Sequence, residues 1–251
     1  RNDGDRFTDV SEAAGIYGSI IGFGLGITVG DVNNDGWMDI FISNDFFERD
    51  YLYINNHDGT FKEVLESAMP SISAASMGAD VADINNDGWL DIFVTDMLPE
   101  DDYRLKQITT FDNWDRFTYG HSNGYHYQLT RNMLHLNNGN QTFSDISRLA
   151  GVEATDWSWG ALIFDVDNDG SKDIFVANGI HQDITDLDYL SFIADEKTIK
   201  RIVSKQGVDY KALIEPIPIH PVPNYLFQNK GNLQFVNKAG KWGLAEKTHS
   251  N

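Results

Sequence analysis

Residues 30–42 read GDVNNDGWMDIFI, and the pattern returns at residues 82–94 as ADINNDGWLDIFV and at residues 164–176 as FDVDNDGSKDIFV. A second motif follows each copy, reading YLYINN at residues 51–56, NMLHLNN at 132–138 and YLFQNKG at 225–231. Three matches of this length indicate tandem repetition of one structural unit. The prediction of the fold class rests on this repeat.

Each unit predicts four short antiparallel strands, because its β-branched and aromatic runs are bounded by Gly, Asn and Asp. In the first unit the expected strands are residues 26–29, 39–42, 51–54 and 60–64. Four-stranded units in tandem indicate an all-β protein of the β-propeller class. We expect about three blades, at residues 19–71, 72–153 and 154–240, with residues 1–18 ending a preceding unit and 241–251 starting another. Closed propellers have about four to eight blades, so we expect the protein to continue into further blades.

The acidic loops follow the pattern D-x-[DN]-x-D-G-x-x-D. Side chains at positions 1, 3 and 5 converge when the backbone turns tightly, and the Gly at position 6 permits that turn. Position 7 can offer its carbonyl, and Asp at position 9 adds a carboxylate. Ligands that are all oxygen predict three Ca²⁺ sites. The expected ligands are Asp31, Asn33, Asp35, Trp37 and Asp39; Asp83, Asn85, Asp87, Trp89 and Asp91; and Asp165, Asp167, Asp169, Ser171 and Asp173.

Two alternatives compete with this interpretation of the loops. An EF-hand requires Glu at position 12 and flanking helices, whereas this chain has Ile42, Val94 and Val176 there, between predicted strands. The simpler alternative is that the loops are Asp- and Asn-rich hairpin turns without a cation. The threefold repetition of the same oxygen spacing favours calcium.

The composition excludes several classes of function. The 251 residues carry a formal net charge of -19, which opposes binding to the phosphate backbone of nucleic acids. The chain has no cysteine, so disulfides, thiolate metal sites and cysteine nucleophiles are excluded. It also has no apolar run of the roughly 18 residues that a membrane-spanning helix needs.

Two predicted insertions interrupt the repeats. The first, residues 98–131, contains aromatic side chains with polar tips, which suit contact with a protein or a glycan. Its candidate ligand face consists of Trp114, Arg116, Tyr125, His126 and Tyr127. The alternative is that these aromatics pack the insertion onto its blade.

The second insertion, residues 180–224, predicts a helix from Leu187 to Lys205, within the region 186–206. Thr185 and Asp188 resemble a capping box at its start, and Gly207 is a plausible end. A second short helix is expected at residues 209–214.

The segments FGLG at 23–26, MGA at 77–79 and WGA at 159–161 precede the three loops. With them, the repeat resembles the FG-GAP/VCBS repeat found in the integrin α-subunit propeller. DMLPED at 96–101 and TDWSW at 155–159 are similar to segments of secreted bacterial VCBS-repeat proteins of the ASPIC/UnbV and cartilage acidic protein group. The resemblance implies that the matching Asp and Asn residues bind calcium and stabilise blades, and that the protein is extracellular or at the bacterial cell surface.

Two classes of function follow from the sequence. The favoured one is a calcium-stabilised module that binds a protein or glycan, with no catalytic residues assigned. The alternative is an enzyme of the polysaccharide lyase type, since some such lyases are calcium-containing propellers. Its base would come from the first insertion. The excess of negative charge disfavours an anionic polysaccharide as substrate unless calcium bridges it to the protein.

Overall fold

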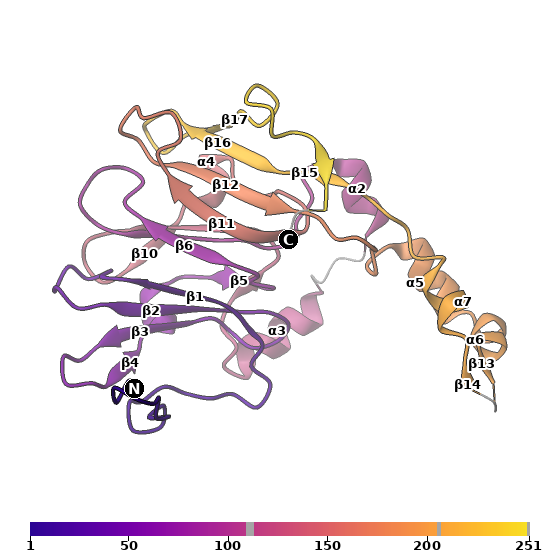
Figure 1. Ribbon diagram of the computed structural model, residues 1–251, viewed down its shortest axis with the longest axis horizontal. Helices are drawn as coiled ribbons and strands as arrows, with labels where there is room; N and C mark the ends of the chain where they lie inside the picture. Colours follow the sequence, from indigo (N-terminus) through magenta and orange to yellow (C-terminus); the bar gives the residue numbers. More distant parts are fainter. Residues whose placement is uncertain (109–112, 205–206, 250–251) are drawn as a thin grey trace.

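The computed structural model describes residues 1–108, 113–204 and 207–249. Residues 109–112 of the predicted first insertion, residues 205–206 at the end of the predicted helix and residues 250–251 lie outside this description. Three four-stranded antiparallel sheets, one for each repeat, form the body of the protein (Figure 1). The predicted strands of the repeat are therefore present, and the protein is mostly β.

The strands of each sheet follow the chain order. The first sheet contains β1 (Gly24–Gly30), β2 (Asp39–Asn44), β3 (Tyr51–Asn55) and β4 (Phe61–Glu63). The second contains β6 (Ala79–Ala82), β7 (Asp91–Val94), β9 (Met133–Asn137) and β10 (Phe143–Asp145). The third contains β11 (Ser158–Phe164), β12 (Asp173–Asn178), β16 (Tyr225–Asn229) and β17 (Phe235–Asn237).

The register of the three sheets is the same. The second strand pairs with the third through Ile40 and Tyr53, Ile92 and His135, and Ile174 and Phe227. The acidic loop always joins the first strand to the second. The repeat in sequence is thus a repeat in structure.

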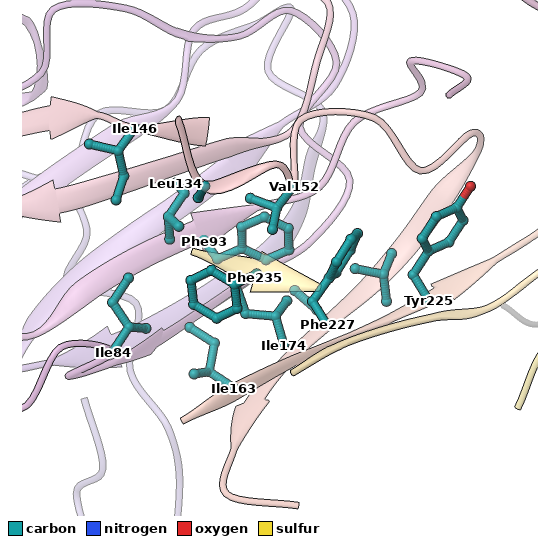
Figure 2. Packing of buried hydrophobic residues seen from close by; sticks show 13 residues of the cluster. Ile84, Phe93, Leu134, Ile146, Val152, Ile163, Ile174, Tyr225, Phe227 and Phe235 are labelled. Atoms are coloured by element: carbon teal, nitrogen blue, oxygen red, sulfur yellow. The ribbon is translucent and has the colours of Figure 1, made fainter. Parts of the chain in front are cut away.

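The sheets stack in chain order, with β6 lying between β1 and β11 (Figure 1). One apolar cluster fills the space between the first and second sheets and includes Phe41, Leu52 and Ile92. A second cluster lies between the second and third sheets. Figure 2 shows Phe93, Leu134 and Ile174 meeting there. Burial of these side chains supplies the main stabilising free energy of the stack.

The outer faces of the stack are also apolar. Thr28 donates to the carbonyl of Ala79 in the second sheet, so its neighbours Ile27 and Val29 point away from that sheet. Ile27 is 73% exposed and Val29 is 53% exposed. On the third sheet, Ile163 is buried against the second sheet, and its neighbour Leu162 is 54% exposed. Within the described residues the stack is open, so the closed ring of a propeller stays a prediction.

The helices lie mainly in the insertions. The short helices α1 (Leu65–Ala68) and α4 (Ser147–Ala150) follow the fourth strands of the first two sheets. The first insertion contains α2 (Asp102–Gln107) and α3 (Trp114–Ser122), which the sequence analysis did not predict. The second contains α5 (Leu187–Ala194), α6 (Glu196–Ile202) and α7 (Tyr210–Ile214), which extend away from the sheets (Figure 1).

The helical insertion predicted near residues 186–206 is present, but it consists of two helices where a single one was expected. Asp195 has an extended backbone, and its side chain accepts a hydrogen bond from the N–H of Thr198, so one helix ends and another begins there. The first of these helices is capped by Asp186, which accepts from the N–H of Tyr189 at 2.9 Å, and not by the predicted capping box. The short helix expected at residues 209–214 is present as α7.

Three two-stranded pairs complete the described structure. They are β5 (Ile72–Ser73) with β8 (Gln128–Leu129), β13 (Val203–Ser204) with β14 (Gly207–Val208), and β15 (Val222–Pro223) with β18 (Lys247–Thr248). The first pair is parallel, a departure from the antiparallel pattern expected from the sequence. In the described ranges, no helix has both the length and the apolar character needed to cross a membrane.

Candidate metal centres and ligand cavity

Each acidic loop wraps around the carboxylate at its first position. Asp31 accepts hydrogen bonds from the backbone N–H groups of Asp35 at 3.0 Å and Gly36 at 2.8 Å. The other loops repeat this arrangement, with Asp83 accepting from Asp87 (3.1 Å) and Gly88 (2.8 Å), and Asp165 from Asp169 (3.1 Å) and Gly170 (2.9 Å). The three loops therefore share one conformation.

Left-handed backbone at two positions makes this wrap possible. Gly at position 6 has φ values of 88°, 90° and 90°, as the predicted tight turn requires. Position 4 is also left-handed, with φ of 56° at Asn34, 59° at Asn86 and 58° at Asn168. Asn tolerates this region better than most residues. All three copies have Asn at position 4, so this conformation also has a signal in the sequence.

The Asp at position 9 fixes the loop to the sheet. Both oxygens of Asp39 accept backbone N–H groups, from Val32 at 3.0 Å and from Asn55 at 2.9 Å. Asp91 and Asp173 make the corresponding pairs of bonds. All three carboxylates are almost completely buried. Position 9 thus has a structural role in each loop whether or not a cation is present.

Burial and negative neighbours affect the ionisation of this carboxylate. Burial raises the pKa of Asp91 to about 6, backbone hydrogen bonds oppose the shift, and the charges of Asp87 and Asp83 add to it. Burial likewise raises the pKa of Asp39 and of Asp173. A positive ion held by these carboxylates would favour their ionised form.

In the third loop, three carboxylates already lie close together. One oxygen from each of Asp165, Asp167 and Asp173 lies within 4.8 Å of the other two. Oxygens that share a Ca²⁺ ion at about 2.4 Å are separated by at most about 4.8 Å. The three carboxylates therefore need little movement to reach a common ion.

The neighbours of the loops differ from repeat to repeat. In the first, His57 Nε2 lies 2.8 Å from Asp35 Oδ2, and the imidazole stacks on Trp37 at 5.1 Å between ring centroids. The hydrogen bond to His57 is the largest cause of the lowered pKa of Asp35. In the third, Gln228 donates to Asp167 at 2.6 Å. These contacts orient the side chains at positions 3 and 5.

Amide side chains connect the first two loops to the sheet that follows each of them. Position 4 donates to the position-6 carbonyl of the following loop, from Asn34 to Gly88 at 2.8 Å and from Asn86 to Gly170 at 3.2 Å. The Asn that ends the third strand donates to the preceding loop, from Asn137 to Val32 at 2.8 Å and from Asn229 to Ile84 at 2.9 Å. The loops are therefore also part of the contact between sheets.

The candidate ligand face of the first insertion borders a cavity of about 580 Å³. Four of its five predicted residues line the cavity, namely Trp114, Arg116, Tyr125 and His126. The fifth, Tyr127, lies beside it and stacks on His121 at 3.9 Å between ring centroids. Trp114 is 76% exposed. The opposite wall, formed by Ile21, Phe47 and Ala74, comes from segments that the sequence analysis did not associate with a site.

Several contacts fix the positions of residues that line the cavity. The guanidinium carbon of Arg116 lies 4.7 Å from the centroid of the Phe47 ring, which indicates a cation–π contact. Gln128 donates to the carbonyl of Phe47 at 3.2 Å. His126 has a left-handed backbone, with φ of 64°, and its Nε2 lies 2.9 Å from the carbonyl oxygen of Met69. Strained backbone of this kind persists where surrounding contacts enforce it.

Comparison with known proteins agrees with the repeat structure. A family model described as an FG-GAP-like repeat matches residues 31–94 and 114–176, about half of the chain. The first match runs from the first acidic loop to the end of β7, and the second from the start of α3 into β12. A search of curated proteins finds no match.

Proposed function

The chain belongs to the FG-GAP-like repeat family, and from this premise we propose that it is a calcium-stabilised β-propeller module that binds a protein or glycan. The three sheets are consecutive blades, and each acidic loop holds one Ca²⁺ through the residues at positions 1, 3, 5, 7 and 9. On the motifs shared with secreted VCBS-repeat proteins of the ASPIC/UnbV group, we place it outside the cell or at the cell surface.

The observation that carries the calcium proposal is the common conformation of the three loops. In each, backbone N–H groups fix the carboxylate at position 1, and the carboxylate at position 9 is buried beneath it. Like charges held this close repel one another, and a divalent cation turns the repulsion into attraction. Oxygen ligands without nitrogen or sulfur suit Ca²⁺.

Two features support blades on either side of the stack. The exposed apolar faces around Ile27 and Leu162 match in character the faces that the sheets bury between themselves. The second feature is the space around the glycines of the FG-GAP-like segments. A Cβ on Gly78 would lie 2.5 Å from the carbonyl oxygen of Trp159 in the next sheet, whereas one on Gly160 would meet its nearest atom at 3.8 Å. A further sheet would approach Gly160 as the third sheet approaches Gly78.

The cavity beside α3 is the proposed ligand site. Its volume of about 580 Å³ falls within the range of about 300 to 1,000 Å³ that is typical of ligand pockets. Exposed Trp114 offers an aromatic face for a sugar ring or an apolar side chain, and Arg116 offers hydrogen-bond donors.

Calcium titration of the wild-type chain by calorimetry and thermal melting tests the proposal. We expect about three Ca²⁺ ions per chain and a melting temperature that falls when a chelator is added. A melting temperature unaffected by the chelator would contradict the calcium role.

A glycan array probed with the wild type and with Trp114→Ala tests the ligand site. Loss of binding in the variant, with melting unchanged, supports the cavity. Incubation of the array glycans with and without Ca²⁺ also detects cleavage, which would favour the lyase alternative.

A further inference from the structure

The two insertions and the third sheet meet at one point. Arg104 on α2 contacts Asp156, which precedes β11, at 3.1 Å, and Asp183, which precedes α5, at 2.5 Å. The N–H of Asp183 donates to the carbonyl of Pro218 at 2.9 Å, so the outgoing and returning segments of the second insertion lie side by side. His220 follows on the returning segment. This junction is the base from which α5, α6 and α7 extend (Figure 1).

Negative charge exceeds positive charge at this junction. Asp156, Asp183 and Asp186 are buried, with exposed fractions of 8%, 0% and 7%. In the described part of the chain, the positive groups in ion-pair contact with them are the guanidinium of Arg104 and, when protonated, His220. Three carboxylates against one guanidinium leave an excess of two negative charges, which is unfavourable in a buried setting. One divalent cation would balance it.

The side chains also offer a suitable set of ligand atoms. One oxygen of Asp183, one oxygen of Asp186 and a ring nitrogen of His220 all lie within 4.8 Å of one another. His220 Nε2 is buried without a hydrogen-bond partner and lies 3.7 Å from Asp186 Oδ2. That distance is too long for a hydrogen bond and leaves the nitrogen available as a ligand.

The two carboxylates are already oriented. Asp183 Oδ1 accepts from the N–H of Thr185 at 3.0 Å and from its hydroxyl at 2.6 Å. Asp186 Oδ1 accepts from the N–H of Tyr189, which leaves Oδ2 facing His220. Hydrogen bonds that hold ligating carboxylates in place are typical of metal sites in proteins.

We propose that Asp183, Asp186 and His220 form a binding site for a transition-metal cation of the Zn²⁺ type, separate from the acidic loops. The imidazole nitrogen distinguishes this site from the loops, because Ca²⁺ prefers ligands that are all oxygen whereas Zn²⁺ binds nitrogen and carboxylate together. The bound ion would tie the base of the second insertion together at the junction with α2.

Zinc titration in the presence of saturating Ca²⁺ tests this site. The tag-free full chain is titrated with ZnCl₂ by calorimetry, and bound zinc is counted by elemental analysis after dialysis. We expect one Zn²⁺ per chain and a rise in melting temperature on zinc addition. His220→Ala should weaken zinc binding at least tenfold and abolish the zinc-dependent rise.

Two further variants separate loss of the site from loss of the fold. Asp186→Asn removes a charged ligand but keeps an oxygen that can cap α5, so it should weaken zinc binding while the chain stays folded. His181→Ala is the matched control, because His181 is exposed on the same insertion and lies outside the cluster; it should bind zinc as the wild type does.

Three outcomes would overturn the proposal: absence of zinc binding below about millimolar concentration in the wild type, equal binding in His220→Ala, or complete displacement of zinc by Ca²⁺.

Discussion

His135, on β9, should make the protein sensitive to acid. It occupies the position of Tyr53 and Phe227 in the other two sheets, so an imidazole replaces an aromatic ring in the apolar stack. The side chain is completely buried, and neither ring nitrogen has a hydrogen-bond partner. Burial lowers the pKa of His135 from 6.5 to about 4; Asp145 opposes this shift, and Arg131 and His126 add to it.

The sign and size of the effect follow from proton linkage. Because the folded pKa is lowered, the unfolded chain binds the proton more readily, and stability present above pH 6.5 is lost as the pH falls toward 4. The full difference of about 2.5 pKa units corresponds to about 3 kcal/mol. Between about pH 8 and pH 5, the loss amounts to about 2 kcal/mol. This is a large fraction of a typical stability of about 5 to 15 kcal/mol.

His135→Phe removes the titrating group and installs the residue found in the third sheet. Other buried groups respond oppositely: burial raises the pKa of Asp50 to about 7 and that of Asp96 to about 6, so these carboxyls favour the folded state as the pH falls. The wild type alone would therefore report a mixture. The difference between the free energies of unfolding of variant and wild type isolates the imidazole.

Urea unfolding at about pH 8 and about pH 5, at constant Ca²⁺, measures this difference. We expect the advantage of His135→Phe to grow by about 2 kcal/mol from the higher pH to the lower. His121→Phe, at an exposed histidine of α3, is the control and should show no such growth. Should Phe prove too large, His135→Leu provides the same comparison. If the free energies of unfolding of the wild type, His135→Phe and His121→Phe changed in parallel with pH, the reasoning would be refuted.

Three other variants test the loops, the cavity and the contact between sheets. Asp167→Asn should weaken calcium binding in the third loop, where Asp stands in place of the Asn of the other two loops. At Ca²⁺ about ten times Kd, each site would contribute about 1.4 kcal/mol to stability. A calcium titration unchanged in the variant would rule out the expectation that the third loop binds calcium most tightly. Trp114→Ala should reduce ligand binding without altering the melting temperature, which a paired array and melting experiment checks. Gly78→Ala should destabilise by about 1 to 3 kcal/mol because its Cβ would clash with the Trp159 carbonyl. Gly160→Ala, at the equivalent position, should be neutral in the same urea assay, because its Cβ would make only an ordinary contact at 3.8 Å.

The repeat was readable from the sequence because strand and loop signals are local. Gly, Asn and Asp mark the turns, and apolar alternation marks the strands, so every four-stranded sheet was predicted. The order of the strands follows from the short connections between them. The Asn at position 4 and the Asn ending each third strand were equally visible. Their roles were not, because the bonds of Asn34 and Asn137 reach another repeat.

The insertions were less predictable, for two physical reasons. The break between α5 and α6 depends on whether the Asp195 side chain caps a helix or faces solvent. The helical spacing of apolar residues does not decide between these two. The cavity beside α3 depends on Phe47 and Ile21, which are distant in sequence from Trp114. One wall of the cavity was predictable as a candidate face from the residues of the first insertion. The other wall forms only because segments flanking the strands of the first sheet pack against that insertion.

The acidic loops join two roles that are usually considered separately. The same segments that we propose bind a cation also bond to the neighbouring repeat, through Asn34 to Gly88 and Asn86 to Gly170. A cation that fixes the conformation of one loop would therefore also fix a hydrogen-bond partner of the neighbouring loop. Three independent sites at Ca²⁺ about ten times Kd would contribute about 4 kcal/mol. Because the loops are bonded in series, ordering one lowers the conformational entropy that the next loses on binding, so we expect calcium to bind the three loops with positive cooperativity.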